Sequence, residues 1–233
     1  MISVIIPTLN EEDYVANIIY FLRECENESI PLEIIISDGG STDQTISIAE
    51  KAGADLVLRS GKKGRSAQMN FGAFYAKGDI LYFLHADTFP PANFAMQINH
   101  AVKNKCSSGC FTLRFDHTHW FLKTNCWFTR FNVNAFRFGD QSLFVNRKLF
   151  NFVHGFSEKH FLLEDQEIIT RLKKNSRFAV IQEPVTTSAR KYLQNGIYKT
   201  QGIFFLIYLM YRLGVGQQNL LNTYRKLICQ DKL

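Results

Sequence analysis

The first hundred residues alternate between short apolar runs and stretches with helical periodicity. The apolar runs have the length of buried strands and predict strands at residues 2–7, 33–37, 55–58 and 79–84. The stretches that follow them repeat apolar residues every three or four positions and predict helices at 11–25, 43–52, 66–76 and from Pro90 onward. Strands and helices that alternate in this way form βαβ units, so we expect a parallel sheet with right-handed crossovers.

Two of these helices carry more specific predictions. Asn10 is placed to cap the first helix, since acids follow it in the first turn. In the helix at 66–76, the residues expected to face the sheet are Ala67, Phe71, Phe74 and Tyr75.

The pattern changes after residue 110. Alternating and apolar segments predict strands at 110–115, 141–146 and 177–182, and helices around 119–131, at 164–174 and at 198–213. The last helix is strongly apolar but too short for a membrane span, which needs about 20 apolar residues. We expect one α/β domain in which helices flank a mixed, mostly parallel central sheet.

Polar clusters follow three of the predicted strands. They are Thr8-Leu9-Asn10-Glu11, Asp38-Gly39-Gly40 and His85-Ala86-Asp87, and a fourth cluster, Glu164-Asp165, begins a helix. Ligands of open α/β sheets bind at the carboxyl ends of the strands, so the three loops should converge on one edge, with the fourth cluster facing them. This layout is typical of a nucleotide-sugar site with a metal and a base.

Asp87 is the candidate metal ligand. A carboxylate held at the end of a buried strand lets a divalent cation bridge it to a diphosphate. His85 would point to the same side and act as a second ligand, donate to a phosphate, or only pack. A helix-capping role explains Asp87 equally well.

Asp38 is the candidate nucleotide contact. Gly39 and Gly40 let the backbone approach a ligand closely, and the carboxylate suits the ring N–H of uracil or the ribose hydroxyls. A turn with a helix cap is the alternative, and both descriptions can hold at once.

The remaining candidates are weaker when taken alone. Gly64 and Arg65 precede a helix N-terminus, which favours a phosphate, or they form a solvated basic loop. Glu164 and Asp165 are ordinary partners of a helix dipole, yet beside the strand-end loops they become candidates for a general base. Asp140 could line a sugar or acceptor pocket or sit in a plain turn. Arg190 could clamp a leaving diphosphate or lie on a solvated surface.

Composition adds a question about partners. The net charge of +6 fits nucleic acid, anionic lipid or a phosphorylated ligand. The 21 phenylalanines gather mainly between residues 111 and 161, as an aromatic core or as an acceptor groove or membrane-facing surface. Five cysteines and a first strand that begins beside Met1 predict a cytoplasmic protein with reduced thiols and no signal peptide.

In order and spacing, the four clusters resemble glycosyltransferase family 2 in its GT-A fold, the Rossmann-like fold of nucleotide-diphospho-sugar transferases. Residues 4–12 look like the family's first strand and base-binding loop, and residues 38–43 like its nucleotide loop. His85-Ala86-Asp87 stands where the family has its Asp-X-Asp metal motif, and Asp165 stands at its catalytic base. Motifs at Gly64–Asn70, Gly139–Gln141 and Ser188–Arg190 look like a subgroup of small soluble bacterial members described as associated with radical-SAM proteins.

Two departures from the family pattern matter. His85 replaces the first acid of the metal motif, which puts metal identity in question. The Gln-X-X-Arg-Trp motif of processive members is absent, so a polymer-extruding synthase is not expected.

The resemblance implies an inverting, metal-dependent transferase that uses Mn²⁺ or Mg²⁺ and moves a sugar from a UDP-sugar to an acceptor hydroxyl. Asp87 and His85 would bind the metal, and Asp165 with Glu164 would supply the base. The donor-binding residues would be Thr8, Asn10, Glu11, Asp38, Gly64, Arg65, His85, Asp140 and Arg190. Within a single GT-A domain over 1–233, we expect a donor half at 1–110, an acceptor half at 111–192 and a helical segment at 193–233.

Other function classes remain open at this point. A nucleotidyltransferase would show a Gly-rich, basic first loop, which Pro7-Thr8-Leu9-Asn10 is not. A silent nucleotide-sugar binder would bind UDP without turnover. A basic membrane or nucleic-acid module explains the charge but leaves the strand-end acids unexplained, so nucleic acid is not expected. Residues 197–213 could contact the inner membrane face, and the apolar C-terminal helix could form a homodimer.

Overall fold

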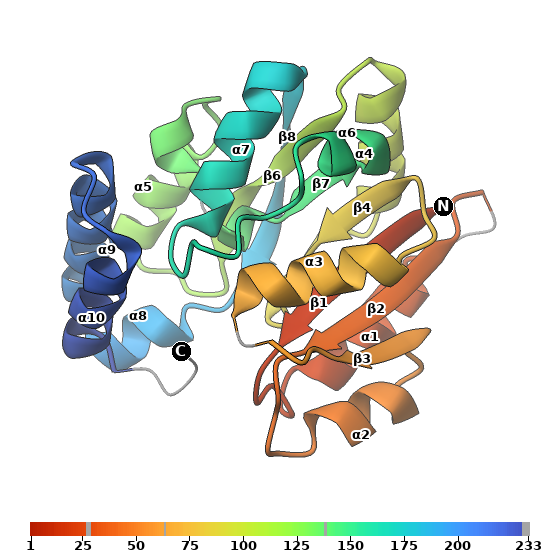
Figure 1. Cartoon of the computed structure of the whole chain (residues 1–233), viewed down its shortest axis with the longest axis horizontal. Coiled ribbons are helices and arrows are strands. Elements are labelled where there is room, and N and C mark those ends of the chain that lie inside the picture. Colours follow the sequence, from red (N-terminus) through yellow and green to blue (C-terminus); the bar gives the residue numbers. More distant parts are fainter. Residues whose placement is uncertain (27–28, 63, 138, 230–233) are drawn as a thin grey trace.

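The computed structural model describes residues 1–26, 29–62, 64–137 and 139–229. Its centre is one sheet in the order β3-β2-β1-β4-β7-β6-β8-β5 (Figure 1). The first four strands pair in parallel, and their bounds are β1 (Ile2–Thr8), β2 (Leu32–Asp38), β3 (Leu56–Arg59) and β4 (Ile80–Phe83).

The second half of the chain extends the sheet from β4. The added strands are β5 (Thr88–Phe89), β6 (Ser108–Phe115), β7 (Leu143–Asn146) and β8 (Phe178–Thr187). β7 is antiparallel to both β4 and β6, β8 runs parallel to β6, and β5 pairs antiparallel with β8 at the edge. The predicted mixed, mostly parallel α/β sheet is confirmed.

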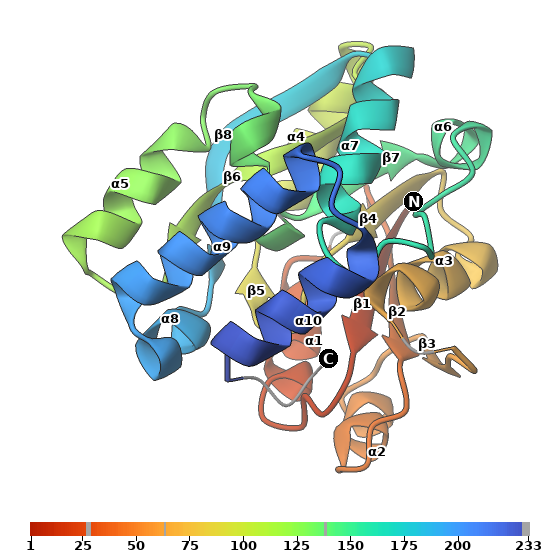
Figure 2. The same ribbon diagram turned by 60° about the vertical axis from the view of Figure 1, so that its left-hand side comes forward.

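Helices cover both faces of the sheet (Figures 1 and 2). Their bounds are α1 (Val15–Glu24), α2 (Thr45–Lys51), α3 (Arg65–Tyr75), α4 (Phe94–Lys103), α5 (Trp120–Phe128), α6 (Arg147–Phe152), α7 (Glu164–Asn175), α8 (Arg190–Asn195), α9 (Ile197–Arg212) and α10 (Gln217–Leu227). Short 3-10 helices span Asn134–Phe136 and Gly139–Gln141. Among the described residues, no helix is both long and apolar enough to cross a bilayer.

The unbroken apolar run of β1 follows from this layering. Successive side chains of a strand point to opposite faces, and both faces here are covered. Val4 and Ile6 enter the core under α1, while Ile5 enters the core under α3. A third, smaller core joins α9 to α10 through Ile203, Ile207, Tyr224 and Ile228.

Two predictions about helices are wrong. α1 begins at Val15, and Asn10 does not cap it; Asn10 adopts φ 52° and its carboxamide oxygen accepts from the Thr42 amide at 2.9 Å. On α3, the predicted inward position of Ala67 is confirmed and Phe71 is half-buried, but Phe74 is 78% exposed and Tyr75 is 45% exposed, and Met69, Gly72 and Ala73 face the core instead. The helix lies so close to the sheet that a Cβ on Gly72 would come within 2.5 Å of Ile5, so the position that meets β1 needs glycine.

Candidate active site

The carboxyl ends of β1 and β2 meet, and their loops are built around Asp38. Thr8 and Asp38 are register partners, and both are buried. The Asp38 carboxylate accepts from the Gly40 amide at 2.9 Å, the Ser41 amide at 2.8 Å and the Thr8 hydroxyl at 3.1 Å. Asp38 therefore organises the loop, and its contact with a nucleotide stays a prediction.

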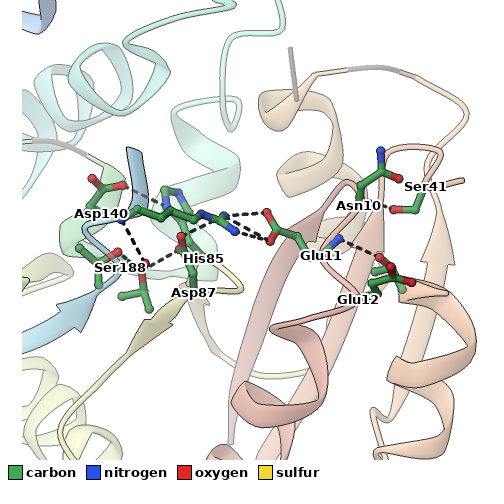
Figure 3. Close-up of polar contacts among 12 residues, drawn as sticks. Asn10, Glu11, Glu12, Ser41, His85, Asp87, Asp140 and Ser188 are labelled. Carbon is green, nitrogen blue, oxygen red and sulfur yellow. Dashed lines mark hydrogen bonds and ion pairs between the residues drawn. The ribbon is translucent and has the colours of Figure 1, made fainter. Parts of the chain in front are cut away.

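Asn10 and Glu11 tie the first loop to the second. The Asn10 amide donates to the Ser41 hydroxyl at 2.8 Å, and the Glu11 amide donates to the Thr45 hydroxyl at 2.8 Å. Figure 3 shows Asn10 turned toward Ser41, while the Glu11 carboxylate extends to the other side. Hydrogen bonds thus join the loop after β1 to the loop after β2.

Gln68 is a site-supporting residue that we did not predict. This side chain of α3 is buried, and its Nε2 donates to the carbonyl oxygens of Thr8 at 2.6 Å and Ser37 at 3.1 Å. The Ser37 hydroxyl donates back to the Gln68 carbonyl at 2.7 Å. The available signal was a polar residue between Ala67 and Met69 on the side of the helix that faces the core.

Arg190 links the two halves of the chain inside the site. From the start of α8, its guanidinium donates to the Glu11 carboxylate at 3.2 Å and lies 3.0 Å from Asp87 Oδ2. It also covers the ring of Tyr14 at 4.4 Å. The same guanidinium contacts both carboxylates, so the strand-end acids Glu11 and Asp87 converge as predicted (both are labelled in Figure 3).

His85 joins this cluster to the predicted base. His85 Nδ1 lies 3.3 Å from Asp140 Oδ1. Next to Asp140, Gly139 leaves room for the base candidate, because a Cβ there would clash with Asp165 Oδ2 and lie 3.2 Å from His85 Cε1. A side chain at position 139 would therefore displace the Asp165 carboxylate, and the shared contact places Asp165 beside His85.

The pKa values of the Asp165 and Asp140 carboxyl groups are shifted in opposite directions. Burial and the nearby Glu164 carboxylate raise the pKa of Asp165 to about 7, against the opposing effects of Arg65 and His85. Burial also acts to raise the pKa of Asp140, but the hydrogen bond and charge of His85 outweigh it and lower that pKa to about 2. Because the two pKa values lie far apart, Asp165 is suited to act as a base and Asp140 to remain an anion.

Glu164 and Arg65 form the support behind Asp165. Glu164 is buried, and its carboxylate accepts from Arg65 Nη1 at 3.2 Å. Leu163, the residue before α7, adopts a left-handed backbone with φ 60°. Gly64, with φ 109°, precedes Arg65 at the start of α3. The guanidinium is thus committed to Glu164, while the backbone at Gly64 is exposed.

The described residues gather no group of three or more His, Cys, Asp or Glu that could hold a metal ion. Asp87 and His85 are the side chains that the site offers. Mg²⁺ and similar cations keep several waters and bind through one or two carboxylates plus substrate phosphates. This donor set fits a cation that arrives with a diphosphate.

Solved structures share the fold at low sequence identity. *S. aureus* TarS with UDP-GlcNAc has a TM-score of 0.67 at 18% identity, covering 80% of this chain and 58% of that chain. A mannosyltransferase from *Pyrobaculum calidifontis* with GDP-Man and Mn²⁺ has 0.64 at 19%, covering 80% and 56%. Glucosyl-3-phosphoglycerate synthase from *Mycobacterium tuberculosis* with Mg²⁺ and UDP has 0.59 at 17%, covering 80% and 70%. These are GT-A glycosyltransferases, so the predicted fold is confirmed.

Curated relatives match part of the chain. TarS, a poly(ribitol-phosphate) beta-N-acetylglucosaminyltransferase of *Staphylococcus aureus*, is 29% identical over 92 residues, which are 37% of this chain and 16% of TarS. An uncharacterized glycosyltransferase of *Haemophilus influenzae* is 33% identical over 115 residues, 44% of each chain. The match therefore spans less than half the length of either relative.

The family profile gives the broader result. The profile of Glycosyl transferase family 2 matches residues 3–157, more than half of the chain, and this span includes the strand-end loops described above. The narrower resemblance to members associated with radical-SAM proteins stays a prediction. The chain belongs to glycosyltransferase family 2.

Proposed function

We propose that this protein transfers a sugar from a UDP-sugar to an acceptor hydroxyl, with inversion at the anomeric carbon. The observation that carries the proposal is the position of Asp165. Its carboxyl group, with a pKa raised to about 7, lies beside His85 in the same site as the strand-end Asp87. Nucleotide-bound structures of TarS and of the mycobacterial synthase support UDP, although the mannosyltransferase from Pyrobaculum calidifontis was solved with GDP-Man.

The donor would bind over the ends of β1 and β2. Thr8, Asn10 and Asp38 fix the shape of these loops through their own hydrogen bonds, so the loop backbone is well placed to hold the base and ribose. Gly64, at the N-terminus of α3, offers exposed backbone near Arg65 to a diphosphate.

Asp87, with His85 as a second candidate, would hold the divalent cation. A bound Mn²⁺ or Mg²⁺ supplies Lewis-acid stabilisation to the departing diphosphate. Asp87 now pairs with Arg190, which would be free to pair with a phosphate once Asp87 takes another partner. His85 is positioned through Asp140, whose lowered pKa keeps it anionic.

Asp165 would be the general base. The acceptor oxygen forms its bond to C1 as the bond from C1 to the diphosphate oxygen breaks, and the hydroxyl proton passes to the Asp165 carboxylate. One displacement from the opposite face inverts the centre. Glu164 is buried against Arg65, so we assign it the role of positioning and of raising the pKa of Asp165. The acceptor would lie on the side of residues 111–192.

Calorimetric titration with UDP, repeated with Mn²⁺, Mg²⁺ and EDTA and with GDP as control, tests the donor proposal. We expect metal-dependent UDP binding that Asp87→Ala loses. Equal binding of GDP would move the proposal to another nucleotide, and metal-independent binding would remove Asp87 from the metal role. UDP binding without turnover on any UDP-sugar and acceptor tried would favour a silent binder.

A further inference from the structure

The positive charge of the chain is gathered in two segments. Residues 117–139 contain three Lys or Arg, residues 184–229 contain six, and neither segment contains an Asp or Glu. Outside them, 18 Lys and Arg stand against 21 Asp and Glu. The net charge of +6 therefore comes entirely from the region of α5 and the region of α8 to α10.

These two segments meet in space. Asn125 Nδ2 on α5 donates to Gln201 Oε1 on α9 at 3.1 Å, and the rings of Phe121 and Tyr198 lie 4.9 Å apart. Figures 1 and 2 both show α5 beside α9 at one end of the molecule, away from β3. Two distant parts of the sequence thus build one basic region.

The outer side of α5 alternates aromatic and basic residues. Both tryptophans of the chain lie here, with Trp120 63% exposed and Trp127 47% exposed. They are seven residues apart and so share one side of the helix, which also carries Lys123, and Arg130 lies just beyond the end of the helix. The Arg130 guanidinium lies over the Trp127 ring at 4.8 Å. Tryptophan beside cations is typical of helices at a membrane–water interface.

α9 exposes an apolar stripe. Thr200, Ile203 and Ile207 bury its inner side. The opposite side carries large apolar residues whose exposed fractions range from 40% to 74%: Tyr198, Phe205, Leu206, Leu209 and Leu213. A surface helix of a soluble protein normally turns polar residues outward, so a stripe of this kind marks an interaction surface.

Exposed cations accompany this stripe and the tryptophans. They are Lys123, Arg130, Lys199 and Arg212. None of them forms a salt bridge with any residue in the part of the chain that the structure describes. The region therefore presents apolar side chains and unneutralised positive charge together.

We propose that this region, the α5/α9 surface, binds an anionic lipid bilayer. The α9 stripe would enter the boundary between headgroups and acyl chains, the tryptophans would lie among the headgroups, and the cations would meet lipid phosphates. A second copy of the chain fits less well, because a symmetric contact would set the same cations against each other. A nucleic acid would leave Leu209 and Leu213 in water.

Vesicle binding tests the proposal without nucleotide, so its result is independent of the transferase proposal. Vesicles of phosphatidylcholine are compared with vesicles that also contain phosphatidylglycerol, at low and high salt, by co-sedimentation. We expect binding to the anionic vesicles that high salt weakens. Since both tryptophans lie in the surface, their emission should shift to shorter wavelength on binding.

Matched variants distinguish binding through the α5/α9 surface from nonspecific binding to vesicles. Phe205→Ser with Leu209→Ser, and Lys199→Glu with Arg212→Glu, should each lower partitioning by about tenfold or more. Phe74→Ser with Tyr75→Ser on α3 removes equally exposed aromatics elsewhere and should leave binding unchanged. Circular dichroism and melting curves confirm that each variant is folded.

Three results would overturn the proposal. They are failure to bind anionic vesicles, an equal loss of binding in the α3 control, and a lipid-free dimer that Phe205→Ser with Leu209→Ser dissociates. The last result would assign the surface to a second copy of the chain.

Discussion

At the residue scale, Asp165 shows how a common side chain acquires an uncommon pKa. An acid at a helix start is usually stabilised as the anion. Here burial and the neighbouring Glu164 reverse that preference, and Gly139 has no side chain to displace the carboxylate. A base is most useful when its pKa lies near the working pH, so this environment matches the proposed role.

Replacing Asp165 tests that role directly. Asp165→Asn should lower turnover by about 10²–10⁴-fold with little change in UDP affinity. Because the base acts only when deprotonated, wild-type activity should fall about tenfold per pH unit below about pH 7. The residual activity of Asp165→Asn should not show this fall in activity at low pH. Wild-type turnover in Asp165→Asn would remove the residue from the base position.

The folding stability of the same variant is the control. A carboxyl group whose pKa is raised in the folded state keeps a proton there that the unfolded chain has lost. Wild-type stability should therefore fall as the pH rises from the usual aspartate range to about 7. Asp165→Asn removes that cost, so its melting temperature at pH 8 should equal or exceed the wild-type value. A large drop would mean that lost activity reflects unfolding.

At the scale of elements, α3 shows that tight packing selects residue size. Ala67, Gly72 and Ala73 lie against the sheet, and Phe74 and Tyr75 are displaced to solvent. The same helix brings Gln68 to the ends of β1 and β2. Close packing of α3 is thus a condition for holding the two nucleotide loops together.

One substitution made at two helical glycines should have opposite effects. Gly72→Ala brings a Cβ within 2.5 Å of the branched Ile5 side chain and should lower the free energy of unfolding by about 1–3 kcal/mol. Gly202→Ala on α9 meets nothing within 4 Å and should raise it by about 0.5–1 kcal/mol, because alanine favours the helix. Urea unfolding midpoints compare the two. A stabilised Gly72→Ala would show that α3 does not lie this close to β1.

Periodicity predicted the elements better than their faces and ends. The apolar spacing of Val15, Ile18, Ile19 and Leu22 located α1 and its buried side correctly. It did not locate the start of that helix. Asn10 has a left-handed backbone, and its side chain accepts a hydrogen bond from the Thr42 amide in the loop after β2 instead of capping the helix. On α3, hydrophobicity predicted that Phe74 faces the sheet. The short distance between this helix and β1 determines which side of the helix is buried, and Phe74 is exposed. Such distances are set by tertiary contacts, which a periodic pattern does not contain.

At the scale of the whole molecule, Arg190 joins parts of the chain that lie 179 residues apart. The order of strand-end clusters was enough to predict that Glu11 and Asp87 meet. The order of β7, β6, β8 and β5 was not predictable, because alternation assigns faces to a strand but not neighbours. The pairing of Arg190 with Glu11 and Asp87 was therefore not predictable, because it depends on the position of β8 in the sheet.

Removing that link should affect both folding and binding. Arg190→Ala leaves the largely buried Glu11 and Asp87 carboxylates without their cation, and should destabilise the protein by about 1–3 kcal/mol and weaken UDP binding. Arg190→Lys should restore only part of either, because a point charge cannot replace the guanidinium fork. Melting curves and UDP titration measure both effects.

Lys51→Ala, at an exposed lysine on α2, is the matched control and should change neither quantity. Arg190→Ala with wild-type melting and UDP affinity would mean that the contacts with Glu11 and Asp87 contribute nothing.

The Arg190 guanidinium, which contacts both Glu11 and Asp87, also affects whether folding requires a metal ion. In a domain that folds around its metal, an apo chain is an unfolded chain, and a chelator denatures it. Here a side chain already supplies the positive charge that two neighbouring carboxylates need. The charge balance of this part of the fold therefore does not depend on a cation, and in the proposed mechanism a divalent ion would bind together with the substrate.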